Sequence, residues 1–346
     1  MQKSNHIKKL TKILHENAAY LIVLVPIFAC WIFWNLYKTY WTNTDPSAWY
    51  FIDSLSIFAG GSYKFVDHPG TPVQIIGSLL LGLTFPFFGN RQEFINYHIA
   101  RPEVFYYMTN LFLVIFNGLT AAFLYKISKE RIKFQPILAG LAIALSYFAI
   151  HPSSLKMLTY WQHNALYFPL GTLWWALLYK KIADGKFSNK DGLVFGIAAG
   201  VFANIQVFFI PFIFSSILIS FLYTWKQAQS LKRGIIGAGY SILGSLIGII
   251  ALLIPIYREV PRFWAWLMKV TFSENLYGDG KVSFFTFDAL LESMRRWRMD
   301  NETVILFGIL MIVGCCVGLF YRQKYNVKLP GHLPPYSQRS QFIFLF

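Results

Sequence analysis

Long apolar runs recur along the whole chain, and only short charged connectors separate most of them. A helix needs about 20 apolar residues to cross a hydrocarbon core about 30 Å thick, and most of these runs come close to that length. Hydrophobic residues make up 55% of the sequence and charged residues only 14%. We therefore predict an all-α integral membrane protein with about eight transmembrane helices, in one polytopic membrane domain over residues 1–328.

The expected spans follow the apolar runs at residues 18–36, 104–125, 136–150, 166–179, 192–203, 207–224, 234–256 and 303–321. The first is interpreted as a retained helix, because it is long and aromatic and lacks the small-residue cleavage site of a signal peptide. The run at 192–203 is short and rich in glycine, so we expect that it and the next run do not both cross fully. Residues 329–346 form a C-terminal tail, whose short apolar end is compatible with a truncated chain.

The distribution of positive charge predicts which side of the membrane each connector occupies. The net charge is +15, but the lysines and arginines lie beside the spans rather than along one soluble face, which argues against nucleic-acid binding. The basic connectors are residues 1–12, 126–133, 180–190, 226–233 and 322–328. The positive-inside rule therefore predicts a multi-pass protein of the cell membrane with a cytoplasmic N-terminus and with residues 37–103 and 257–302 outside.

The apolar stretch 72–88 is the exception within the first outer segment. It follows Pro69, contains Gly77 and Pro86, and would reverse the side of every later connector if it crossed. We interpret it as a helix that lies in the interface or dips into the membrane without crossing. An ordinary span is the alternative.

Three outer segments carry more polar groups than membrane packing requires, and we expect them to enclose one site. The first segment, residues 37–103, contains Asp45 within about ten residues of the end of the first span, where a carboxylate near apolar groups can act as a general base. A solvated loop aspartate is the alternative. The second segment, residues 151–164, supplies Lys156 and His163 as substrate-binding candidates, or as groups that cap and hydrate a helix end.

The third segment, residues 257–302, places arginines and lysines on the predicted outer side. Arginine matches phosphate oxygens bidentately, which favours a phosphate site, although a solvated loop of mixed charge is the alternative. The candidates are Arg258, Arg262, Lys281, Arg295, Arg296 and Arg298. Apolar residues recur at helical spacing from Leu290 to Trp297, which predicts an amphipathic helix on the membrane surface.

The first outer loop reads TDPSAWYFIDSLSIFAGGSYKFVDHPGTPVQ. In its order of an acidic residue, an amphipathic helix ending near glycines, and an Asp-x-His-Pro-like element, it resembles GT-C fold glycosyltransferases of the protein O-mannosyltransferase and aminoarabinose transferase type. The likeness covers roughly the first 130 residues, and the rest follows by helix order. The chain departs from the pattern at Asp45-Pro46, where mannosyltransferases commonly have an acidic pair, and at Gly70, in place of a second proline.

The resemblance implies transfer of a sugar from a polyprenyl-phosphate carrier to an acceptor lipid, glycan or protein at the outer face. Asp45 would be the base, Asp67 and His68 would lie with it in the catalytic group, and Arg101 would bind substrate. The basic residues of the last loop would hold the carrier phosphate. The three cysteines lie in apolar runs, where they act as small hydrophobic residues, so they indicate no metal site. The sequence calls for no cofactor, and it leaves a divalent metal open.

A transporter or flippase of a lipid-linked saccharide is the alternative class. Such proteins place ionisable groups and broken helices near the membrane midplane. The expected spans are nearly free of charge, and Asn110, Asn117 and Gln206 are their more notable polar residues. An inactive relative that only binds lipid or partners is a third possibility.

Overall fold

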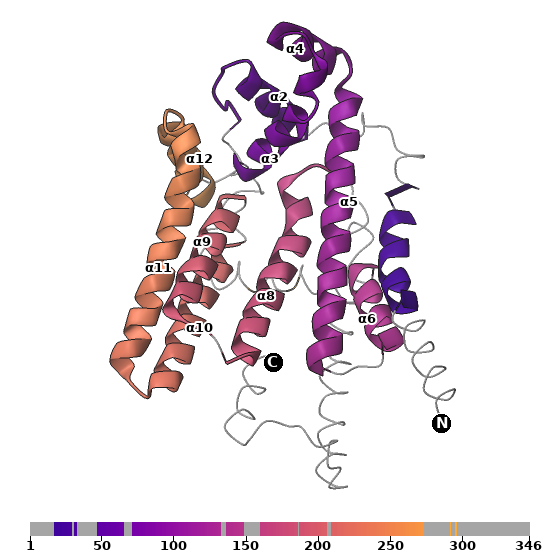
Figure 1. Cartoon of the computed structure of the whole chain (residues 1–346). Helices are drawn as coiled ribbons and strands as arrows, with labels where there is room; N and C mark the ends of the chain where they lie inside the picture. The colour runs from indigo at the N-terminus through magenta and orange to yellow at the C-terminus, as the bar shows by residue number, and fades with distance from the viewer. Residues whose placement is uncertain are drawn as a thin grey trace, which may run out of the picture. The chain divides into compact units, whose positions relative to one another are not determined.

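The computed structural model describes residues 17–29, 31–32, 47–65, 71–132, 136–148, 160–185, 187–205, 209–272, 291 and 295. The chain divides into two compact units, one made of residues 1–148 and 152–280 and the other of residues 149–151 and 281–346. Every helix labelled in Figure 1 belongs to the first unit. The span expected at 303–321 and the tail at 329–346 lie outside the described residues.

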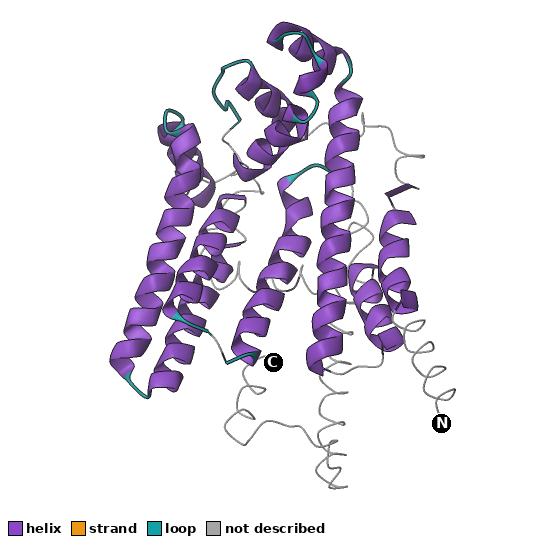
Figure 2. Cartoon of the chain, in the orientation of Figure 1, coloured by secondary structure: helices purple, strands orange, loops and turns teal. Residues whose placement is uncertain are grey.

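All regular elements among the described residues are helices, joined by loops (Figure 2), which confirms the all-α class. A first helix, Asn17–Ala29, carries no label. The labelled α-helices (Figure 1) are α2 (Ser47–Phe58), α3 (Thr71–Gly82), α4 (Arg91–Ala100), α5 (Pro102–Ile127), α6 (Pro136–Phe148), α8 (Tyr167–Ala183), α9 (Asn189–Ile205), α10 (Ile210–Ala228), α11 (Leu231–Leu253) and α12 (Val260–Phe272). The short helical turns are η2 (Phe85–Phe87), η3 (Ser128–Ile132), η4 (His163–Leu166) and η6 (Ile254–Ile256).

Two described helices are long and apolar enough to cross a membrane. They are Pro102–Glu130, which is α5 with its final turn, and Leu231–Ile256, which is α11 with η6. The other helices from α6 to α10 lie close to the expected positions without meeting the same length and hydropathy requirements. Membrane-spanning helices are therefore supported, and a total of about eight crossings stays a prediction.

The stretch 72–88 forms α3 and η2, and the chain then turns sharply into α4. Thr71–Phe87 and Arg91–Ala100 meet at 116°, a bend that suits a broken span or a re-entrant segment. Asn90 caps α4, because its side-chain oxygen accepts a hydrogen bond from the Glu93 backbone N–H. At ten residues, α4 is about 15 Å long, too short to cross by itself.

Small residues bring α9 and α11 into backbone contact. A Cβ on Gly196 would fall on the carbonyl oxygen of Ser241, and one on Gly200 would fall on that of Ser245. From the other helix, a Cβ on Gly244 would fall on the carbonyl oxygen of Leu193. Close approach through small residues is the usual way in which membrane helices associate, so the glycines of the short run at 192–203 have a packing role.

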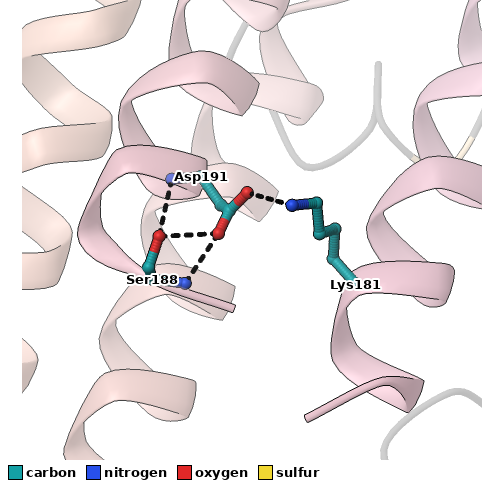
Figure 3. Close-up of polar contacts among 3 residues, drawn as sticks. All are labelled: Lys181, Ser188 and Asp191. Carbon is teal, nitrogen blue, oxygen red and sulfur yellow. Dashed lines mark hydrogen bonds and ion pairs between the residues drawn. The ribbon is translucent and has the colours of Figure 1, made fainter. Parts of the chain in front are cut away.

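A polar cluster joins the end of α8 to the start of α9 (Figure 3). Asp191 Oδ1 pairs with Lys181 Nζ at 2.8 Å, and its Oδ2 accepts hydrogen bonds from the backbone N–H and hydroxyl of Ser188. The Asp191 N–H in turn donates to the Ser188 hydroxyl at 3.3 Å, so the two residues form a reciprocal cap. Burial opposes ionisation of Asp191, but these hydrogen bonds outweigh it and lower the pKa of the carboxyl.

Candidate functional site

Helix α2 forms buried hydrogen bonds with the second of the three polar segments. The Ser47 hydroxyl donates to the Trp161 carbonyl oxygen at 2.6 Å. One turn later, the Tyr50 hydroxyl and Nδ1 of His163 are hydrogen-bonded at 2.7 Å. Trp161 is itself buried, with its ring against Phe105 of α5. The segments that start α2 and α8 are therefore joined, as expected for one site.

Asp53 is a buried carboxylate on α2 that holds the loop after the helix. Its side chain is 2% exposed and accepts hydrogen bonds from the backbone N–H groups of Lys64 at 3.1 Å and Phe65 at 2.8 Å. Gln74 of α3 donates its amide to the same carboxylate at 2.9 Å and to the Phe65 carbonyl oxygen at 2.8 Å. Side chains from α2 and α3 therefore both hold this loop by hydrogen bonds.

Burial dominates the electrostatics of this cluster. It raises the pKa of Asp53, although hydrogen bonds from Phe65 and Lys64 and the charges of Lys64 and Arg262 oppose it. Burial, with a smaller contribution from the Asp53 charge, raises the pKa of Tyr63 to about 12. Because Asp53 already accepts three hydrogen bonds, we interpret it as a residue that supports the loop rather than one that takes a proton from substrate.

The third polar segment reaches the same loop through α12. The Arg262 guanidinium donates from a terminal N–H to the Lys64 carbonyl oxygen at 2.9 Å. Tyr63, which precedes Lys64 in the chain, forms a small buried cluster with Ile256, and Phe263 of α12 packs against this cluster. Arg258, on the turn before α12, donates to the Tyr257 hydroxyl at 2.8 Å. Arg262 and Lys64 are both exposed, so this bond brings two cations together at the surface, and Arg258 is exposed on the turn before α12.

The described substrate-binding candidates, His163 and Arg101, have different surroundings in the structure. His163 is 8% exposed and bonded to Tyr50, so it lies within the joint between segments rather than on an open surface. Arg101 directly precedes α5, is exposed, and places its guanidinium 5.3 Å from the centre of the Tyr97 ring. No described contact joins Arg101 to the Asp53 cluster.

Several candidates lie outside the described residues. These are Asp45, Asp67, His68, Lys156, Lys281, Arg296 and Arg298. Arg295 and Leu291, both helical, are the described members of the amphipathic helix expected at 290–297, and they belong to the second unit. Within the first unit, the described residues contain no group of three potential metal ligands from His, Cys, Asp and Glu.

Sequence reasoning missed two features of this site. It did not single out Asp53, although a lone carboxylate inside the apolar helix YFIDSLSIF has to find hydrogen-bond donors if it is buried. It also left α12 unassigned, although Phe263, Trp264 and Met268 recur close to a helical period after Pro261.

No family model, curated protein or solved structure matches this chain.

Proposed function

We propose that this chain is a membrane glycosyltransferase that moves a sugar from a polyprenyl-phosphate carrier to an acceptor at the outer face of the membrane. The observation that carries the proposal is the meeting of three polar segments at α2 and the loop after it. Bonds from Ser47 and Tyr50 join the second segment, and the bond from Arg262 to Lys64 joins the third. Apolar helices supply the membrane anchorage that a lipid-linked donor requires.

The exposed cations suit the leaving group of such a reaction. When a glycosyl phosphate bond breaks, negative charge builds on the phosphate, and fixed cations stabilise it. Arg262 lies on the first turn of α12 and contacts the loop at Lys64, and Arg258 lies on the turn before α12. A guanidinium carries five N–H donors, so the bond from Arg262 to Lys64 is compatible with a phosphate contact.

In the proposed step, an acceptor oxygen attacks the anomeric carbon with inversion while the bond from that carbon to the phosphate oxygen breaks. The electron pair of that bond leaves with the polyprenyl phosphate, and the acceptor proton passes to the carboxylate of Asp45. Asp67 and His68 are proposed to assist within the same loop, and Lys156 to bind substrate. Arg258 and Arg262 are proposed to hold the carrier phosphate, the role that the resemblance also implies for Lys281, Arg295, Arg296 and Arg298.

The supporting side chains have a defined place in this proposal. Asp53 and Gln74 fix Phe65, which directly precedes the segment that contains Asp67 and His68. The bond from Tyr50 orients His163 through its Nδ1. Catalytic groups need such support because a displacement of about 1 Å can cost on the order of a hundredfold in rate.

The test is turnover of defined donors by the purified full chain in lipid nanodiscs. Polyprenyl-phosphate hexoses and pentoses are supplied with candidate acceptors, and free polyprenyl phosphate is followed by mass spectrometry. Release by the wild type, with loss of nearly all release in Asp45→Asn, is the expected result. Asp184→Asn, at the opposite end of α8, is the matched control and should retain activity.

The same preparation separates the enzyme from a transporter. In asymmetric vesicles, movement of the lipid-linked sugar between leaflets without release of carrier phosphate would assign the chain to the flippase class. Neither release nor movement with any donor tested would overturn both assignments.

A further inference from the structure

A buried histidine lies at the corner where α3 turns into α4. His98 is 0% exposed and is surrounded by aromatic rings, with the centres of Phe94, Tyr97 and Phe88 at 4.6, 5.3 and 5.9 Å from its own. Its Nε2 is 2.9 Å from the hydroxyl oxygen of Thr84. The imidazole therefore ties α4 to the turn that follows α3.

The hydroxyl of Thr84 fixes the protonation state of the ring. This hydroxyl has a single proton, which it donates to the Leu81 carbonyl oxygen at 2.8 Å. In the contact with His98 the Thr84 oxygen must therefore accept, so Nε2 carries the imidazole proton. Nδ1 is then an unprotonated nitrogen, and it is buried without a hydrogen-bond partner.

We propose that this corner, residues 81–100, is an acid-sensitive joint in which protonation of His98 at Nδ1 releases α4 from the turn at Thr84 that follows α3. The neutral ring satisfies its one donor and packs well. Protonation adds a second N–H, at Nδ1, and a positive charge to the ring. The described residues around Nδ1 provide no hydrogen-bond acceptor for this N–H. A buried unsatisfied charge is costly, and exposure of the ring to water by displacement of α4 relieves that cost.

Among the described residues, no charged side chain is paired with the ring of His98. The charged residues on the elements packed around it are Arg91, Glu93 and Arg101 on α4 and at its end, Glu103 at the start of α5 and Asp53 on α2. Glu93 accepts a hydrogen bond from the Gly89 N–H, and Asp53 is bonded to the loop at Lys64 and Phe65. Arg91, Glu93 and Arg101 are exposed to solvent.

The direction of the pH effect follows from burial, which lowers the pKa of His98 below its usual value of 6.5. The open corner, with a solvated imidazole, binds a proton more readily than the closed one. The closed corner is therefore fully stable above about pH 6.5 and loses stability as the pH falls below that value. Opening should increase by up to about tenfold per pH unit until the pKa of the closed state is reached.

Hydrogen exchange of the full chain in nanodiscs tests this inference without reference to any activity. Exchange of peptides from residues 85–100 is followed from about pH 7.5 to 4.5, with correction for the intrinsic pH dependence of exchange. Peptides from α11 give the internal reference. The expected result is a loss of protection in 85–100 below about pH 6.5 by up to tenfold per pH unit, with α11 unchanged.

Two variants separate the titration of the ring from a general weakening of the corner. His98→Gln keeps an amide donor for Thr84 but cannot titrate, so protection in 85–100 should lose its acid dependence. His98→Phe, which suits the aromatic surroundings, should behave in the same way if the glutamine variant fails to fold. Acid dependence that persists in both variants, or wild-type protection that is flat or rises on acidification, overturns the proposal.

Discussion

Arg262 donates a hydrogen bond of 2.9 Å to the backbone carbonyl oxygen of Lys64, a residue 198 positions earlier in the chain. The bond connects α12 to the loop whose other side is held by Asp53. It brings a cation of the basic outer segment expected from sequence against the first outer segment. The surface around this bond is where we propose that the carrier phosphate binds.

Replacing Arg262 with Ala should weaken binding of polyprenyl phosphate by about ten- to 150-fold, because a charge-assisted hydrogen bond contributes about 1.5–3 kcal/mol. The fold should change little, since the bond to Lys64 is exposed. Binding is measured by titration of the purified chain with a fluorescent polyprenyl phosphate. Arg233→Ala, an exposed arginine at the start of α11, is the control and should bind normally. Equal affinity in all three proteins would leave Arg262 with only a loop contact.

Replacing Asp53 with Asn should lower the free energy of unfolding by about 1–3 kcal/mol, because the amide leaves one of three buried donors without an acceptor. Amide exchange at Lys64 and Phe65 should accelerate more than exchange in α11. Thermal unfolding and hydrogen exchange of the purified chain measure the two effects. Glu93→Gln, an exposed acid on α4, should cost less than about 0.5 kcal/mol. An Asp53→Asn protein as stable as wild type contradicts the supporting role.

The helices could be predicted from sequence because burial in an apolar medium imposes long uninterrupted runs. The helix that the first outer loop was expected to form before its glycines is α2, and the runs at 104–125 and 234–256 are the two long helices of the structure. Helix α4 was missed because it is polar. Its capping residues, Asn90 and Glu93, are a signal that could have revealed it.

The contacts of the site could not be predicted in the same way. The pairing of Tyr50 with His163 joins residues 113 positions apart, and nothing local in either segment specifies the partner. The polarity of the outer segments was enough to select them as candidates for the site. Which of their side chains are exposed, as the arginines are, and which are buried, as Asp53 and His163 are, depends on how the helices pack. Sequence therefore indicated which segments gather, and packing decided which side chains face water.

Tyr50 and His163 should be energetically coupled. The variants Tyr50→Phe and His163→Leu and their combination form a double-mutant cycle, read by thermal unfolding of the purified chain. Residues that share a buried hydrogen bond show coupling of about 0.5–3 kcal/mol. Tyr50→Phe preserves the ring packing against Phe65, so its effect reports mainly on the hydroxyl. Additive losses in the double variant would show that the two side chains act independently.

Asp191 should contribute stability that depends on pH. Its hydrogen bonds lower its pKa below 3.8, so its contribution is fully present above about pH 4 and is lost as the pH falls towards the lowered pKa. At neutral pH, Asp191→Asn should cost about 1 kcal/mol, typical of a helix cap. The difference from wild type should shrink in acid. Lys181→Ala should cost less than about 1 kcal/mol, because Lys181 is about half exposed. A difference between wild type and Asp191→Asn that is constant down to about pH 2.5 contradicts this linkage.

The contact between α9 and α11 should tolerate no added methyl group at its centre. Gly200→Ala places a Cβ on the carbonyl oxygen of Ser245, in backbone that cannot move without separating the helices. Overpacking of this kind costs about 1–3 kcal/mol, and thermal unfolding of the purified chain measures it. Gly239→Ala is the matched control, because a Cβ there meets nothing within 4 Å and alanine favours a helix over glycine by about 1 kcal/mol.

The two variants should therefore move stability in opposite directions although both change glycine to alanine within a helix. Helix propensity alone predicts a gain in stability at both positions. A loss of stability in Gly200→Ala therefore reports the cost of overpacking between the two helices. Retained or increased stability in Gly200→Ala would mean that the two backbones are farther apart than the structure places them. The short glycine-rich run at 192–203 would then need another physical explanation.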